Sequence, residues 1–129
     1  MIRVKLTSIM VADQERARHF YTEVLGFVIK HDVPMGGANW LTVVAPDDPE
    51  GVELLLEPLG HPASVTFQQA LYRDGVPLTQ LYTEDLRAEH RRLTGLGVVF
   101  NDAPQQMGPV LVADFHDTCG NLIRLVQAG

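Results

Sequence analysis

The chain repeats itself once along its length, and this repeat limits its fold more than any other feature. The stretch "VADQERARHFYTEVLGFVI" (11–29) matches "TEDLRAEHRRLTGLGVVF" (83–100). Each copy holds an acidic residue, a helical segment, a Leu-Gly pair and an apolar run. Asp13 and Asp85 are predicted helix N-caps, and the glycine of each Leu-Gly pair falls where the helix should end. Between the aspartate and that glycine, the second copy is one residue shorter than the first.

Apolar runs on both sides of the two helices predict the strands. The expected strands cover residues 3–11, 27–31, 39–45, 51–57, 78–83, 98–100, 110–115 and 121–127. Each copy then has the order β-α-β-β-β, and Pro62 to Asp74 is expected to form a short linker helix. We therefore predict an α+β fold in which two such modules, at about 1–58 and 76–129, form one domain of residues 1–129.

Composition narrows the class of protein. With 129 residues, 46% of them hydrophobic, the chain can bury the core of one globular domain. A net charge of −6 without any run of Lys or Arg argues against nucleic acid and anionic membrane surfaces as partners. We expect no signal peptide and no transmembrane helix, since no long apolar run is present. The single cysteine, Cys119, excludes an intrachain disulfide and fits a cytoplasmic protein.

Three stretches together resemble a known family: "VADQERARHFYTEVLGF", "DLRAEHRRLTGLGV" and the closing "FHDTCGNLIRLVQ". Their order is similar to that of the vicinal oxygen chelate superfamily, which includes glyoxalase I, bleomycin resistance proteins and extradiol dioxygenases. The closing stretch resembles the usual Phe-x-Asp-Pro-x-Gly-Asn-x-Ile-x-Leu ending, with Thr118 and Cys119 in place of Pro and an acidic residue. The resemblance implies that the curved mixed sheets of the modules form a cup-shaped cavity for a small molecule. It also implies a homodimer.

The resemblance further implies four metal-ligand positions, and this chain departs from the family at most of them. His is usual seven residues before each helix-capping aspartate, where this chain has Leu6 and Leu78. Glu is usual on the last strand of each module, where this chain has Glu53 and Arg124. The separations of 72 and 71 residues suggest the same register in both modules. Because leucine cannot bind a metal and arginine stays protonated, we expect no metal site and no cofactor.

The loss of these ligands bears on the function that the resemblance implies. We expect a metal-independent protein that binds a small apolar or anionic molecule, in order to sequester or detoxify it. The alternative is an enzyme of the same superfamily, either a metal-free or a metal-dependent lyase, isomerase or dioxygenase. His116, with Asp114 and Asp117 close by in the sequence, is the best remaining metal candidate, although this spacing is unspecific.

Strand alternation from the four positions predicts which side chains face the cavity. The expected ligand-binding residues are Leu6, Ser8, Glu53, Glu57, Leu78, Gln80, Tyr82 and Arg124. Among them Arg124 stands out, because a buried guanidinium is costly unless it is paired or holds a ligand. We expect it to meet Glu53, either within a chain or across a dimer; the alternatives are Glu57 and an anionic ligand. Trp40 lies in a run that is apolar on both faces of its strand, so its face stays open.

Overall fold

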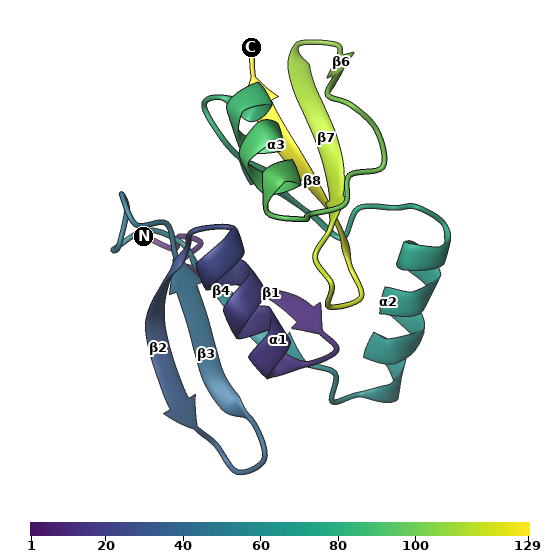
Figure 1. The fold of residues 1–129 in the computed structure, drawn as a ribbon. Coiled ribbons are helices and arrows are strands. Elements are labelled where there is room, and N and C mark those ends of the chain that lie inside the picture. Colours follow the sequence, from purple (N-terminus) through teal and green to yellow (C-terminus); the bar gives the residue numbers. More distant parts are fainter. The chain divides into compact units, whose positions relative to one another are not determined.

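The computed structural model describes residues 1–129, which form two compact units, residues 1–65 and 66–129. Each unit contains one four-stranded mixed sheet, and its own helix lies against one face of that sheet (Figure 1). The predicted α+β class and the two repeated modules are therefore confirmed. None of the helices has the length and apolar character needed to cross a bilayer. That the two modules form one domain stays a prediction.

The first unit begins with a strand, continues with a helix of two parts and ends with three more strands. These elements are β1 (Leu6–Val11), α1 (Gln14–His19), η1 (Phe20–Val24), β2 (Val28–Pro34), β3 (Asn39–Val44) and β4 (Glu53–Pro58). The strand order in the sheet is β1-β4-β3-β2, with β1 parallel to β4 and the other neighbours antiparallel.

The core of this unit lies between the sheet and its helix. The sheet contributes one alternating set of buried side chains, namely Ile9, Val11, Leu41, Val43, Leu54 and Leu56. The helix contributes Ala17, Phe20 and Tyr21, which are also buried. Gln14 fixes the start of the helix to the sheet, because its Nε2 donates to the carbonyl oxygens of Asn39 (2.8 Å) and Leu56 (2.9 Å).

The predicted helix ends are confirmed in both units. The Asp13 carboxylate accepts a hydrogen bond from the backbone N–H of Arg16 at 3.0 Å, and Asp85 accepts one from Ala88 at 3.1 Å. Gly26 and its repeat counterpart Gly97 have φ values of 96° and 92°. L-residues with a side chain rarely adopt this left-handed backbone, so glycine suits both helix ends.

The one-residue difference between the two copies appears in the first helix as a wider turn. The α1 helix ends at His19, and the chain continues as the π-helical turn η1. Here the backbone N–H of Leu25 donates to the carbonyl of Phe20, five residues back, at 3.0 Å. A π-turn takes up an extra residue without changing the cap at either end. The first helix therefore holds one more residue than the second between equivalent ends.

The second unit repeats this arrangement after a connecting helix, α2 (Pro62–Arg73), which begins in the first unit and matches the predicted linker helix. The elements that follow are β5 (Thr79–Tyr82), α3 (Leu86–Gly95), β6 (Gln105–Met107), β7 (Val110–His116) and β8 (Leu122–Ala128). The strand order is β5-β8-β7-β6, with β5 parallel to β8.

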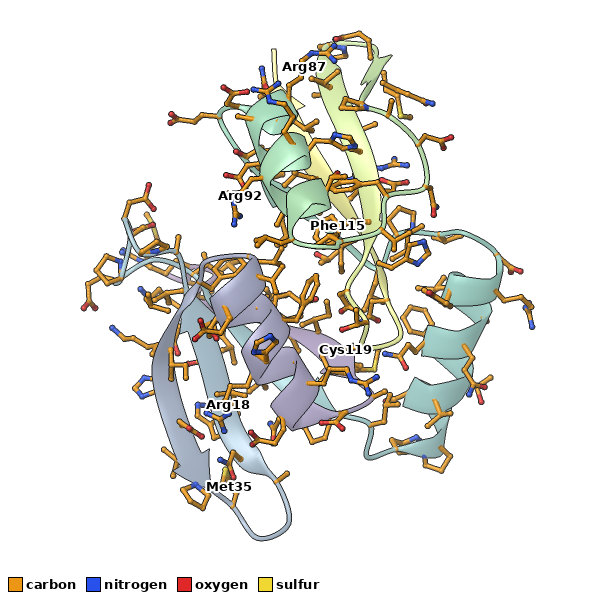
Figure 2. All side chains as sticks on the ribbon, viewed as in Figure 1. Arg18, Met35, Arg87, Arg92, Phe115 and Cys119 are labelled. Carbon is orange, nitrogen blue, oxygen red and sulfur yellow. The ribbon has the colours of Figure 1, made fainter.

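The α3 helix covers one face of the second sheet. Leu86 and Leu93 are its buried residues, and the backbone N–H of Leu86 donates to the Gln127 side chain on β8 at 2.8 Å. Three rings continue this core (Phe115 is labelled in Figure 2). His90 on α3 lies 4.4 Å from Phe100, measured between ring centroids, and Phe100 lies 5.6 Å from Phe115.

One predicted strand is wrong, and several bounds differ. Residues 98–100 form no strand: Val98 is buried and Phe100 makes an isolated bridge to Phe115. Val98 and Phe100 therefore pack in the core beneath α3, whereas Val99 is exposed. The edge strand is β6, Gln105–Met107, whose residues are all exposed. Elsewhere β1 starts at Leu6, three residues later than predicted, and β2 runs on to Pro34.

A buried polar network holds the loop between β7 and β8. Asp117 is fully buried and its carboxylate accepts from the backbone N–H groups of Cys119 (2.7 Å) and Asn121 (3.0 Å) and from the Asn121 amide (2.8 Å). Gln68 of α2 donates to the Cys119 carbonyl and to the Asn121 side chain. Cys119, labelled in Figure 2, lies at the tip of this loop. The closing sequence motif is therefore a tightly tied turn.

Candidate functional site

Each sheet has a second face, opposite its own helix, which we name the distal face. In the first unit this face carries Leu6, Ser8 and Met10 of β1 opposite Glu53, Leu55 and Glu57 of β4. The same face continues through Trp40 and Thr42 of β3 to Val33 and His31 of β2. The four residues predicted here for ligand binding, Leu6, Ser8, Glu53 and Glu57, thus share one surface.

Glu53 is the charged group most enclosed on the distal face of the first unit. Its side chain is 20% exposed, and its Oε1 accepts a hydrogen bond from the hydroxyl of Thr42 at 2.8 Å. The Nε2 of His31 lies 3.7 Å from the same oxygen, and the His31 side chain is 48% exposed. Thr42 itself is fully buried. A neutral hydroxyl therefore positions this carboxylate more firmly than the nearby histidine does.

The register assigns the face of Trp40, which the sequence left open. Trp40 pairs with Val33 on β2 and stands two residues from Thr42 on β3, so its indole belongs to the distal face. Its exposed fraction is 36%, close to the 40% of Leu6, which lies on the same face on strand β1. Leu55 and Val44, on the same face, are buried. The distal face of the first unit is thus largely apolar around Glu53.

Arg124 takes its carboxylate partner from the neighbouring strand of its own sheet. Its Nε donates to Asp114 Oδ1 at 2.8 Å and its Nη2 to Asp114 Oδ2 at 3.0 Å, a two-pronged contact with directly opposed residues. The side chains are 24% and 18% exposed. This hydrogen bond raises the pKa of Arg124 above its ordinary value, which keeps the guanidinium charged. The expected pair of Arg124 with Glu53 within one chain is therefore wrong, because Glu53 accepts from Thr42 instead; the same pair across a dimer stays a prediction.

Counting across the expected hairpin gives the face of the Arg124 partner but not the partner itself. A hairpin that closes symmetrically about the expected turn, residues 116–120, brings Asp114 opposite Leu122, whereas the observed ladder is centred one residue later and brings Asp114 opposite Arg124. The repeat relates Arg124 to a residue of the other module and gives no information on its neighbour across the hairpin. Thr42 and His31, the neighbours of Glu53, carry no comparable sequence signal, because a register irregularity between Ile29 and His31 sets the pairing of β2 with β3.

The sheet register also corrects the equivalence of Glu53 and Arg124. Glu53 lies opposite Leu6, seven residues before the capping Asp13. Arg124 lies opposite Gln80, five residues before Asp85. The two positions therefore differ by two residues along the strand, which keeps them on the same face of the sheet but gives them different neighbours. In the first unit, the residue opposite Ser8 at the position of Arg124 is Leu55.

The other predicted residues of the second unit are spread along its β5 edge. Gln80 and Tyr82 lie on the distal face with Arg124, opposite Arg124 and Val126, and both are exposed. Leu78 just precedes β5; its backbone N–H donates to the Leu122 carbonyl at 2.8 Å and its side chain is half-buried. Asp114 joins this set as a residue that the ligand-binding prediction omitted.

His116, the remaining metal candidate of the sequence, has neutral partners. Its Nδ1 lies 2.8 Å from the hydroxyl of Tyr72 on α2, and its Nε2 lies 2.6 Å from the Asn101 side-chain oxygen. Asp114 is engaged with Arg124 and Asp117 with its own loop. Nowhere in residues 1–129 do three or more His, Cys, Asp or Glu side chains form a group suited to a metal ion.

The two sheets, their repeat and the closing loop match those of a known group of proteins. Residues 3–125 match the Glyoxalase/Bleomycin resistance protein/Dioxygenase superfamily, and the chain belongs to it.

Among its relatives, the Bacillus subtilis protein YurT is 49% identical over 126 residues, which cover 98% of this chain and 99% of YurT. The crystal structure of UcmS2 is similar, with a TM-score of 0.84, 33% identity and 99% coverage of both chains. That of TnmS3, an antibiotic binding protein from Streptomyces sp. CB03234, has a TM-score of 0.79 and 31% identity, and the match covers 100% of this chain and 98% of TnmS3.

Proposed function

We propose that this protein binds a small molecule without a metal ion and protects the cell by sequestering it. Membership of the superfamily supports small-molecule binding in general. The similarity to TnmS3 supports the narrower role, because that protein is an antibiotic binding protein and the match spans nearly the whole of both chains. Because one fold can carry several functions, the function of this protein must be inferred from the residues of its site.

The observation that carries the metal-independent role is the chemistry at the family's ligand positions. Leu6 and Leu78 offer no donor atom, and Arg124 supplies a fixed positive charge that is already paired with Asp114. Divalent metals of this class need several His or carboxylate ligands directed at one point. The sheet register adds to this, because the residue opposite Leu78, at the counterpart of Glu53, is Leu122, another side chain without a donor.

The distal face of the first unit also favours an apolar body in the ligand. Leu6, Trp40 and Val33 are partly exposed there, and binding sites for small molecules are mostly apolar with a few polar groups. An anionic ligand, which Arg124 alone suggested, loses its support because Asp114 already balances that charge. We retain a homodimer and a cytoplasmic location as parts of the proposal, on the same grounds as in the sequence.

The lone tryptophan makes the proposal testable before the ligand is identified. Trp40 is the only indole in the chain, so a change in tryptophan emission reports on the distal face of the first unit. We expect purified protein to bind members of an antibiotic panel with micromolar or tighter affinity, and to do so equally well after treatment with EDTA. Elemental analysis should find no stoichiometric metal. About one zinc, nickel, iron or manganese per chain, or binding lost with EDTA, would contradict the proposal and favour the enzyme alternative.

A further inference from the structure

The charged groups on the two distal faces are balanced to different degrees. On the second unit, Arg124 and Asp114 satisfy each other through two hydrogen bonds. On the first unit, Glu53 has a hydroxyl and a loosely placed histidine as its side-chain partners. No Lys or Arg side chain forms a salt bridge with it. Among the carboxylates of the two distal faces, Glu53 is therefore the enclosed one whose charge is left largely uncompensated.

The hydrogen bonds around Glu53 leave one side of its carboxylate available. Thr42 donates to Oε1, and His31 stands near that same oxygen. The Thr42 hydroxyl in turn accepts from the backbone N–H of His31 at 3.2 Å, so its proton is directed at Glu53. These two consecutive hydrogen bonds orient the Glu53 carboxylate through its Oε1 atom. The second oxygen, Oε2, keeps its capacity to accept hydrogen bonds.

A ligand that covers this face removes water from the second oxygen, Oε2, and must replace the hydrogen bonds that the water supplied. Leu6 lies opposite Glu53, and Leu55 and Trp40 lie on the same face, so an apolar body placed there removes water from the carboxylate. A carboxylate that loses water without gaining a partner is strongly disfavoured. A ligand with an ammonium, amidinium or similar group avoids this penalty and gains a charge-assisted hydrogen bond. A ligand with a carboxylate of its own adds repulsion to the penalty.

From this geometry we propose that Glu53 selects the ligand, and that the ligand joins an apolar body to a cationic, hydrogen-bond-donating group that meets Glu53 Oε2. The inference rests on the proposed function, since it describes the ligand of that same site. Glu53 thus acts as a specificity residue, with Thr42 as its positioning residue. The net charge of −6 works in the same direction, because it attracts cations and repels anions at long range.

Three probes that share one apolar body but differ in charge test this inference. They are naphthalen-1-ylmethylamine, a cation; naphthalen-1-ylmethanol, which is neutral; and naphthalen-1-ylacetate, an anion. Their affinities are measured by calorimetry at about pH 8 for the native protein, Glu53→Gln and Glu23→Gln. Glu53→Gln keeps the shape and the oxygen that accepts from Thr42 but removes the charge. Glu23→Gln removes one charge from an exposed position on η1, outside the distal face.

We expect the native protein to bind the cation at least about tenfold more tightly than the anion, as one charge-assisted hydrogen bond suggests. Glu53→Gln should weaken the binding of the cation and so reduce the ratio of the two affinities to within roughly threefold. Glu23→Gln should leave this ratio unchanged. Equal affinities in the native protein, or an unchanged ratio in Glu53→Gln, overturn the role of Glu53 and leave the proposed binding function in place. Failure of all three probes to bind overturns both the role of Glu53 and the proposed binding function. Circular dichroism confirms that each variant is folded.

Discussion

Replacing Arg124 with methionine should destabilise the second unit by roughly 2 kcal/mol, between the values typical of exposed and buried ion pairs. The structure places the pair between these limits. Two hydrogen bonds of 2.8 and 3.0 Å join Arg124 to Asp114, and the side chains are 24% and 18% exposed. Arg124→Met keeps the apolar stem of the side chain, so the loss comes mainly from leaving the Asp114 carboxylate enclosed without a cation.

Urea unfolding followed by circular dichroism measures this loss. Tryptophan emission does not suffice, because the lone Trp40 lies in the first unit. Arg73→Met is the matched control: Arg73 also pairs with an aspartate, Asp74, but these side chains are 72% and 58% exposed, so its effect on stability should be much smaller than that of Arg124→Met. The double variant Arg124→Met with Asp114→Leu should recover at least half of the loss, since it leaves no unpaired charge.

A loss for Arg124→Met no larger than that of Arg73→Met would refute this reasoning. So would a double variant whose loss is simply the sum of the two single losses, because the two groups would then have no measurable coupling. In that case the contact between Arg124 and Asp114 would not stabilise the unit, and the Arg124 charge would remain available to a ligand.

Three further outcomes are expected. Asp117→Ala should destabilise by roughly 2–4 kcal/mol in urea unfolding, because it strands two buried backbone N–H groups and an amide, while exposed Asp102→Ala should change little. The hydrogen bond from Arg18 lowers the pKa of Asp32, which means that ionised Asp32 stabilises the folded state. This contribution to the free energy of unfolding is present at neutral pH and is lost as pH falls below about 4. The Asp32→Asn variant should therefore be less stable than the native protein at neutral pH, and this difference in stability should shrink on acidification. Equal stabilities at neutral pH would contradict the prediction. Light scattering at micromolar concentration should give the mass of a dimer, and a monomer mass would remove that expectation.

Signals that span a few neighbouring residues predicted much of the fold. The N-caps Asp13 and Asp85 and the helix ends at Gly26 and Gly97 were predicted correctly, because a cap depends on residues three or four positions away. The single-residue difference between the copies was also visible in the sequence. Its form was not, since whether an extra residue enters a loop or a π-turn depends on how Phe20 and Tyr21 pack against the sheet.

Features that depend on pairing between distant segments could not be predicted in the same way. The apolar run at residues 98–100 looks like a strand in isolation, but Phe100 packs between His90 and Phe115, and the neighbouring edge strand forms from exposed residues instead. Burial by α3 outweighed the local preference for a strand, as tertiary packing often does.

Local alternation told which residues share a face, because side chains on a strand must point to opposite sides in turn. It therefore brought Leu6, Ser8, Glu53 and Glu57 together correctly. Alternation does not tell which residue lies across the ladder, since sliding one strand by two positions keeps every face and changes every neighbour. Only the tertiary structure decided that Arg124 pairs with Asp114 and that Glu53 accepts a hydrogen bond from Thr42. These partners determine which of the two charged side chains is available to a ligand.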